Sequence, residues 1–234
     1  MKKNIAKEKI KNGIPSIGTW VSSGNPLVCE TLATSGIDWI NIECEHSSID
    51  LGELVHCFRA VEHSDIPVFV RVAGSDPLII KRVVDSGAGS ISDETMANMY
   101  ISSGSNFIVG PLTNKDVALA CNRKKVPYMP GCLTPSEISK AEELGCDVVK
   151  VFPADSVDGP SFIKSVLAPM PWSWIMPTGG VDMEEEGLKN WLNSGVFSVG
   201  VGSKLFTSEI IKNKDWGLLE SQSKKLVEII KKIK

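Results

Sequence analysis

The chain has 234 residues, a length that fits one α/β barrel or two smaller domains. Hydrophobic residues make up 42% and charged residues 23%, as in an ordinary globular protein with a substantial core. The formal net charge of −3 gives no reason to expect a nucleic-acid partner, and no apolar run approaches the ~20 residues of a membrane helix. The N-terminus lacks a signal-peptide core and the six cysteines are scattered, so we expect a cytoplasmic protein with reduced thiols.

Strands and helices alternate in the first half of the chain. Apolar runs at 14–21, 37–44 and 66–73 are typical of strands. Each of these runs is followed by a segment with helical periodicity, at 25–36, 50–64 and 76–87. The Gly/Ala-rich piece "GAGSI" (87–91) is a candidate for one further short strand.

The second half repeats this alternation with shorter runs that each end in Gly or Pro. They begin near Asn106, Val126, Asp147, Trp174 and Phe197. Helical patterns at 135–146 and 183–195 lie between them, and an amphipathic helix is expected at 220–234. Thr134, followed by Pro135 and Glu137, has the spacing of a helix N-cap with a capping box.

This alternation predicts parallel βα units. We expect an α/β fold, a TIM-type (β/α) barrel formed as a single domain over residues 1–234. A strand at 87–91 would bring the count to about nine against the usual eight, so either this piece belongs to a long helical connection or the barrel is irregular there. An open doubly wound sheet is the alternative, although no GxGxxG follows the first strand.

The segment "DVVKVFPAD" (147–155) places Lys150 inside an apolar strand. A buried ammonium is costly unless it is paired or deprotonated, and apolar surroundings favour the neutral amine that attacks a ketone. Strand alternation puts Val148, Lys150 and Phe152 on one face. The other interpretations are a structural ion pair or a lysine that extends to solvent from the strand end.

Two glycine-rich turns end the last two expected strands. They are "PTGG" (177–180) and "GVGS" (200–203), at the positions where barrels commonly bind phosphate. Glycine lets backbone N–H groups approach an anion, so Gly179, Gly180, Gly202 and Ser203 are candidate phosphate ligands. The alternative is that these glycines only form tight βα turns.

From Gly87 to about Phe206 the chain resembles the KDPG/KHG aldolases, class I enzymes that cleave 2-keto-3-deoxy-6-phosphogluconate or 4-hydroxy-2-oxoglutarate. The resemblance is carried in order by "GAGSI", "NFIVGP", "YMPGCLTPSE", "VKVFPAD", "MPTGGV" and "VGVGSKLF". It implies that Lys150 is the imine-forming lysine and that Thr178 contacts the substrate carboxylate. It also implies a TIM barrel that acts without a cofactor on a keto acid and, in some members, a phosphate.

From Gly13 to about Gly87 the chain resembles another family of TIM barrels, the HpcH/HpaI aldolases, in "IGTWVSSGNP", "GIDWINIECEH", "PVFVRV" and "DPLIIKRVVDSGA". This resemblance implies that Arg71 holds the keto acid and that His46 is a base. A rim salt bridge is the other interpretation of Arg71. Residues 1–87 and 88–234 therefore look like halves of two families, either a recombined or engineered chimera or a divergent natural aldolase.

The residue at the position of proton transfer differs from the residue found in the KDPG/KHG aldolases. The family's second-strand glutamate aligns with Asn41, whereas Glu43 lies two residues on and on the same face. We expect Glu43 to take the role, with His46 as a substitute and an ordinary polar rim as the alternative. The carboxylate pair that holds the HpcH/HpaI metal has no counterpart here, so no catalytic metal is expected.

These observations lead to three hypotheses of function. The first is a lyase, a Schiff-base aldolase that cleaves or forms a 2-keto-3-deoxy sugar acid or its phosphate, yielding pyruvate and an aldehyde. The second is a barrel chimera with little or no catalysis that retains an anion site. The third is a metal-dependent HpcH/HpaI-type aldolase. Nothing in the sequence decides whether the chain forms a homo-oligomer.

Overall fold

The structure is a computed structural model that describes residues 8–9, 12–72, 86–181, 184–202, 205 and 207–232. It divides into two compact units. The first unit comprises residues 1–69, 181–193 and 197–234, and the second comprises 70–180 and 194–196. None of the helices within the described ranges is long and apolar enough to cross a membrane.

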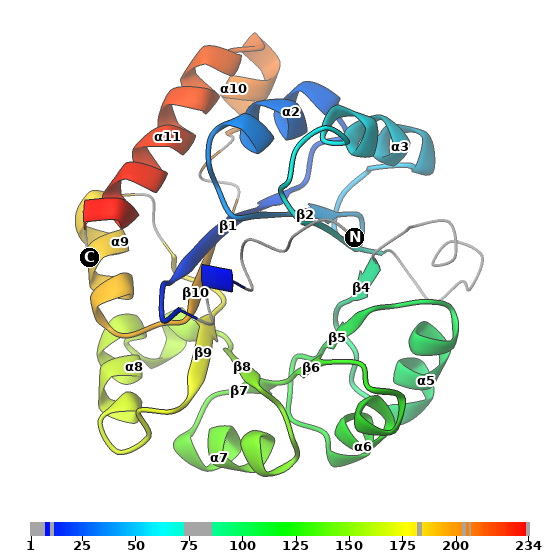
Figure 1. Ribbon diagram of the computed structural model, residues 1–234, viewed down its shortest axis with the longest axis vertical. Coiled ribbons are helices and arrows are strands. Elements are labelled where there is room, and N and C mark those ends of the chain that lie inside the picture. Colours follow the sequence, from blue (N-terminus) through cyan, green and yellow to red (C-terminus); the bar gives the residue numbers. More distant parts are fainter. Residues whose placement is uncertain are drawn as a thin grey trace. The chain divides into compact units, whose positions relative to one another are not determined.

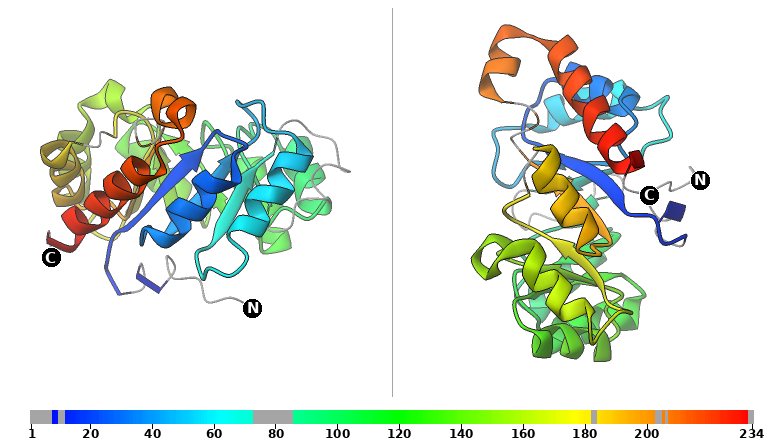
Figure 2. Two further views of the ribbon diagram at one scale, coloured as in Figure 1. Left: turned by 90° about the horizontal axis from the view of Figure 1, so that it is seen from above. Right: turned by 90° about the vertical axis from the view of Figure 1, so that its left-hand side faces the viewer.

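The first unit has parallel strands covered by helices. Its sheet runs in the order β10-β1-β2. The chain passes through β1 (Ser16–Val21), α2 (Pro26–Thr34), β2 (Trp39–Glu43), α3 (Leu51–Ala60), α9 (Glu185–Asn193), β10 (Ser198–Val201), α10 (Ser208–Asn213) and α11 (Trp216–Lys232). Helices α11, α2 and α3 lie side by side on one face of β1 and β2 (Figures 1 and 2).

One interior face of this unit is shaped by a tryptophan. The register places Gly18 opposite Trp39, and a Cβ on Gly18 would overlap the indole ring. A Cβ on Gly200 would also lie 2.9 Å from Cη2 of Trp39, so both glycines make room for this side chain. The Ser198 hydroxyl accepts a hydrogen bond from the indole N–H at 3.3 Å. The large side chain of Trp39 on β2 therefore requires small residues at the facing positions of β1 and β10.

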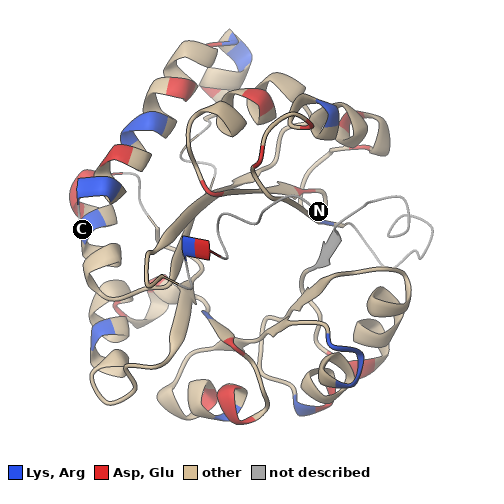
Figure 3. Cartoon of the chain, in the orientation of Figure 1, with Lys and Arg blue, Asp and Glu red and all other residues tan. Residues whose placement is uncertain are grey.

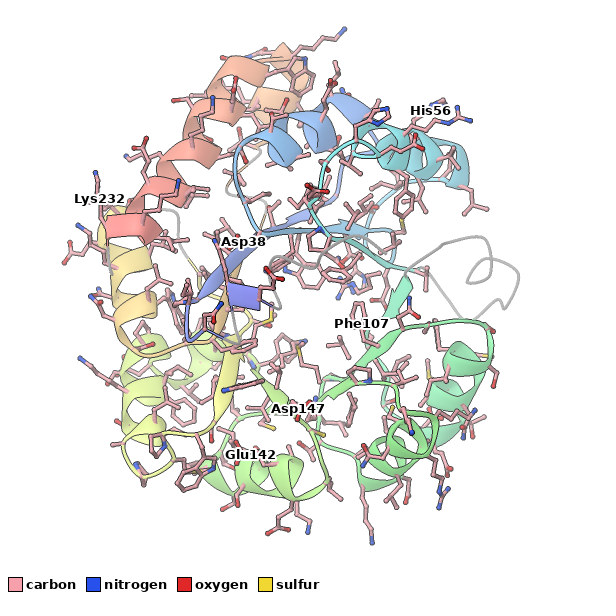
Figure 4. The ribbon with its side chains drawn as sticks, in the orientation of Figure 1. Asp38, His56, Phe107, Glu142, Asp147 and Lys232 are labelled. Carbon is pink, nitrogen blue, oxygen red and sulfur yellow. The ribbon has the colours of Figure 1, made fainter. Side chains whose placement is uncertain are left out.

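A buried carboxylate joins the N-terminal segment to this sheet. Asp38, at the start of β2 (Figure 4), accepts a hydrogen bond from the Ile17 N–H at 2.9 Å and pairs with Lys9 Nζ at 2.5 Å. The Asp38 side chain is only 3% exposed. A buried charge needs such partners, so the pair holds Lys9 against the sheet.

The second unit also consists of parallel strands and helices. It comprises β4 (Ser86–Ala88), α5 (Glu94–Ser102), β5 (Phe107–Val109), α6 (Lys115–Lys124), β6 (Tyr128–Met129), β7 (Gly131–Cys132), α7 (Pro135–Glu143), β8 (Val148–Val151), a 3-10 turn (Ala154–Val157), α8 (Gly159–Leu167) and β9 (Trp174–Pro177). Strands β4, β5 and β6 pair in that order, and so do β7, β8 and β9. The boundary between the units falls within β3 (Val68–Arg71), whose last two residues pair with β4.

Most predicted elements are present, with some changes of extent. The further strand expected at 87–91 is β4, displaced by one residue at its start. The strand expected near Val126 is interrupted, because Pro130 between β6 and β7 has no N–H to donate. The helix expected at 76–87 falls mostly outside the described residues. The capping box at Thr134 is confirmed, with reciprocal hydrogen bonds of 3.2 and 2.9 Å to Glu137.

Charged residues are concentrated on the helices and loops, whereas the strands carry few of them (Figure 3). His56 is exposed and projects from α3 (Figure 4), as expected for a surface histidine rather than a ligand. A charged residue within a strand is therefore an exception that calls for an explanation, and Glu43, Arg71 and Lys150 are three such residues.

Candidate active site

Lys150 lies in the middle of β8, and its backbone is held on both sides. The register pairs it with Gly131 of β7 and with Met176 of β9. Its N–H donates to the carbonyl of Pro130 at 2.9 Å. Burial alternates along β8, with Val149 and Val151 buried and Lys150 half-buried. The lysine side chain therefore leaves the strand on the face opposite its most deeply buried neighbours.

The amine of Lys150 rests against an aromatic ring. Its Nζ lies 4.2 Å from the centroid of the Phe152 ring, within the range of a cation–π contact. Phe152 is two residues further along on the same face and is 38% exposed. Strand alternation predicts Phe152 on this face, but the sequence alone indicates no contact between its ring and the Lys150 amine. The Lys150 side chain is therefore half-buried beside an aromatic ring rather than fully enclosed by apolar groups.

The turn after β9 is tied to the end of β8. Thr178 N–H donates to the Val151 carbonyl at 2.9 Å, and the Thr178 carbonyl accepts from Ala154 N–H at 3.0 Å. Gly179 and Gly180 follow with φ values of +96° and +69°. These conformations favour glycine, so turn geometry alone accounts for both residues. Thr178, a predicted substrate-binding residue, is half-buried in the turn after β9.

A carboxylate packs against the same turn. A Cβ on Gly179 would lie 3.0 Å from Oδ1 of Asp155, and one on Gly180 would lie 2.8 Å from the Asp155 Cβ. Negative charge at this place opposes a second anion. The assignment of phosphate to Gly179 and Gly180 therefore stays a prediction, without support from this geometry.

Arg71 ends β3 and is half-buried within the second unit. Its side chain passes over Gly89, where a Cβ would overlap the Arg71 Cδ. The absence of a side chain at Gly89 therefore leaves room for the Arg71 side chain. The guanidinium fork is suited to a carboxylate, and the role of Arg71 as a keto-acid ligand stays a prediction.

In the first unit, Glu43 closes β2 and is 6% exposed. Its Oε1 accepts hydrogen bonds from the backbone N–H groups of Glu45 at 2.8 Å and His46 at 3.0 Å. The Ser47 hydroxyl also donates to the Glu43 carbonyl. The strand end and the following loop thus fix this carboxylate in one orientation.

His46 differs from Glu43 in its exposure. Its side chain is 66% exposed, and its Nε2 lies 3.7 Å from Oε2 of Glu45. The contact between His46 and Glu43 that carries a hydrogen bond is through the His46 backbone. An exposed imidazole is a weaker candidate for a base than the buried carboxylate beside it.

Gly202, which follows β10, is not crowded by any of the described residues. No heavy atom of the described residues lies within 4 Å of a Cβ placed on Gly202. Within the described residues, neither packing nor a positive φ requires glycine at this position, so close approach of a ligand is one explanation for it. Ser203, the other predicted residue of this turn, lies outside the described residues.

Neither the Cys44 and Cys132 thiols nor a cluster of metal-ligand side chains adds a candidate within the described residues. Burial raises the pKa of the Cys44 thiol to about 12 and that of Cys132 to about 11, so both stay protonated near neutral pH. No group of three or more His, Cys, Asp or Glu side chains suited to a metal ion occurs in the part of the chain that the structure describes. The expected lack of a catalytic metal stays a prediction.

Two family models match the sequence. The model "KDPG and KHG aldolase" matches residues 78–221, and the model "HpcH/HpaI aldolase/citrate lyase" matches residues 16–92. Both predicted resemblances are thereby confirmed, in the expected order along the chain. Whether the chain arose by recombination stays a prediction, as does the assignment of residues 1–234 to a single domain.

Several known aldolases are similar in sequence to this chain. The 2-dehydro-3-deoxy-phosphogluconate aldolase of Haemophilus influenzae is 29% identical over 174 residues, which cover 74% of this chain and 78% of that protein. The hydroxypyruvate/pyruvate aldolase of Paraburkholderia phytofirmans is 37% identical over 90 residues, but these cover only 38% of this chain and 35% of that protein.

Solved structures agree on the fold. A 4-hydroxy-2-oxoglutarate/2-dehydro-3-deoxyphosphogluconate aldolase structure from TTHB1 matches 97% of this chain and 99% of its own, with a TM-score of 0.65 and 21% identity. The KDPG aldolase of Legionella pneumophila, with pyruvate captured as a covalent carbinolamine, matches the same shares with a TM-score of 0.66 and 19% identity. The predicted fold class, α/β of the TIM type, is confirmed.

Proposed function

The chain belongs to the KDPG and KHG aldolase family, whose model covers more than half of it, and from this premise we propose that it is a Schiff-base aldolase. The reaction is the reversible cleavage of a 2-keto-3-deoxy sugar acid, or of its phosphate, into pyruvate and an aldehyde. The proposed chemistry uses no cofactor and no metal. The proposed ligands are a small keto acid and phosphate.

The observation that carries this proposal is Lys150, a half-buried lysine in a strand whose end is hydrogen-bonded to the Thr178 turn. Its amine attacks the keto carbon to form a carbinolamine, which loses water to give an iminium. A base takes the proton of the C4 hydroxyl as the C3–C4 bond breaks, the bonding electron pair moves into the iminium, and the aldehyde leaves. The resulting enamine takes a proton at C3, and water releases pyruvate from the lysine.

The remaining roles rest on the resemblance together with the local geometry of each residue. Glu43 relays the proton at C3, and its burial and fixed orientation support this role. Thr178 and Arg71 bind the carboxylate of the keto acid. The open backbone at Gly202 supports an anion site in its turn.

Borohydride reduction in the presence of pyruvate tests the proposal. The wild type should gain a covalent pyruvate adduct that peptide mass mapping locates at Lys150, and Lys150→Ala should gain none. Lys164 on α8 is an exposed lysine of the same unit, so Lys164→Ala is the matched control and should keep the adduct. An adduct-free wild type whose aldolase activity is abolished by a chelator would instead establish the HpcH/HpaI-type reaction.

A further inference from the structure

Two buried cysteines of the first unit lie next to each other on neighbouring helices. Cys29 belongs to α2 and Cys57 to α3, and these helices pack side by side (Figure 1). Cys29 is 1% exposed and Cys57 is 0% exposed. Their thiols share a hydrogen bond, and the Cys57 thiol also donates to the Gly24 carbonyl at 3.6 Å. The packing of α2 against α3 therefore holds the two sulfur atoms within reach of each other.

The shared hydrogen bond makes the two thiols chemically different. Cys29 donates its proton to the Cys57 sulfur and so lowers the pKa of Cys57, against the opposing effects of burial and of the Glu53 carboxylate. The same bond, together with burial, raises the pKa of Cys29 well above its ordinary value. The thiolate is the form of cysteine that attacks an oxidant. Cys57 is therefore the more reactive member of the pair, and Cys29 is placed to attack its oxidised form.

Cysteines elsewhere in the described chain show the effect of burial by itself. Burial raises the pKa of Cys121 on α6 to about 11 and that of Cys44 to about 12. These thiols stay protonated near neutral pH and are poor nucleophiles, although Cys44 is only half-buried. Reactivity at Cys57 thus comes from its partner rather than from exposure. Its burial favours a small oxidant over a bulky one.

We propose that Cys29 and Cys57 form a redox-sensitive modification site, at which a hydroperoxide converts the two thiols into a disulfide that links α2 to α3. This inference is independent of the proposed aldolase chemistry, which uses neither cysteine. Sulfur atoms that share a hydrogen bond must approach to the ~2.05 Å of an S–S bond, a shift that side-chain rotation can supply. The product carries no charge and no polar hydrogen, so it suits a buried position.

The oxidation has two balanced steps. The Cys57 thiolate attacks one oxygen of hydrogen peroxide, an S–O bond forms, the O–O bond breaks, and hydroxide leaves and takes up a proton as water. The Cys29 sulfur then attacks the sulfenic sulfur of Cys57. The S–S bond forms, the S–O bond breaks, and the departing hydroxide takes the Cys29 proton to give a second water. The two sulfurs together lose two electrons, and the peroxide gains them.

Peroxide treatment of the folded, fully reduced chain tests the proposal. After remaining thiols are blocked, peptide mass mapping without reductant should find the Cys29 and Cys57 peptides joined, with the loss of two hydrogen atoms. A dithiol reductant should separate them. The disulfide closes a loop that includes β2, so the oxidised protein should melt about 5–10 °C above the reduced one.

Substitutions identify the partners. Cys29→Ala and Cys57→Ser should each abolish the linked peptides and the rise in melting temperature, and Cys29→Ser and Cys57→Ala replace them if either variant does not fold. Cys121→Ser is the matched control, since this thiol is also buried on a helix, and it should keep both effects. Three results would overturn the inference: a disulfide that joins Cys57 to Cys44, oxidation of Cys57 to sulfinic acid without a link, or thiols that all stay reduced at a peroxide concentration that oxidises free glutathione.

Discussion

The indole ring of Trp39 occupies the space that a side chain at Gly18 would need. Trp39 is 7% exposed and its N–H is bonded to the Ser198 hydroxyl, so the ring cannot easily move. The same ring leaves little room for a side chain at Gly200 on β10. The interior of the first unit is thus organised around one large side chain and the glycines that face it.

Gly18→Ala should therefore destabilise the protein by about 3 kcal/mol, because overpacking a rigid interior forces the ring or the strand to shift. Urea unfolding measures this change. Trp39→Leu alone creates a cavity, but combined with Gly18→Ala it should recover part of the loss, with a coupling energy of about 1 kcal/mol or more. Strictly additive effects of the two substitutions would contradict the packing described here.

The two candidate bases can be separated by exchange at C3 of pyruvate. Glu43→Gln should lower deuterium incorporation at C3 about 100-fold or more, since it removes the proton-accepting oxygen but keeps the shape. The Lys150 adduct should still form, because it precedes the proton transfer. His46→Gln should change exchange by less than about threefold, as its side chain is exposed. A reversed pattern in the two variants would assign the proton transfer to His46.

Local signals explain why much of the fold could be predicted. The Thr134 capping box depends on residues three apart, so its hydrogen bonds to Glu137 follow from the sequence alone. The alternation of burial at Lys150 follows from the strand period. The break at Pro130 was not predicted, because a proline at this place is compatible with a strand edge as well as with an interruption.

The candidate site was less predictable, since it depends on the orientation of side chains and on their neighbours in space. His46 and Glu43 are three residues apart, yet one is exposed and the other buried, because the loop N–H groups bind the Glu43 carboxylate. The lack of a partner for Asn41 Nδ2 among the described residues likewise depends on neighbours in space. The contact of Asp155 with the Gly179 turn joins segments that no local pattern connects.

Gly202→Ala separates stability from ligand binding. Nothing among the described residues approaches the position of its Cβ, so the free energy of unfolding should change by less than about 0.5 kcal/mol. If the turn binds phosphate, phosphate should raise the wild-type melting temperature, and the variant should lose this shift. Gly217→Ala on α11 is the control and should keep it. An equal phosphate shift in the wild type and Gly202→Ala would exclude the site.

Buried thiols make the stability depend on alkaline pH. Burial raises the pKa of Cys146 from 9.0 to about 12, with smaller contributions from the nearby Cys132 and Cys121. The folded state thus binds this proton more tightly than the unfolded state. The resulting stabilisation is complete below about pH 9 and is lost as the pH rises towards about 12.

Between about pH 7 and about pH 10, Cys146 should therefore contribute about 1.4 kcal/mol to the loss of unfolding free energy. Cys146→Ala and Cys146→Ser both remove the titrating thiol, the second with little change of volume. Each variant should show a pH-dependent loss that is smaller than that of the wild type by about this amount, measured by urea unfolding at both pH values. A wild-type slope in both variants would show that the thiol titrates normally, because the two substitutions share only the loss of the ionisable sulfur.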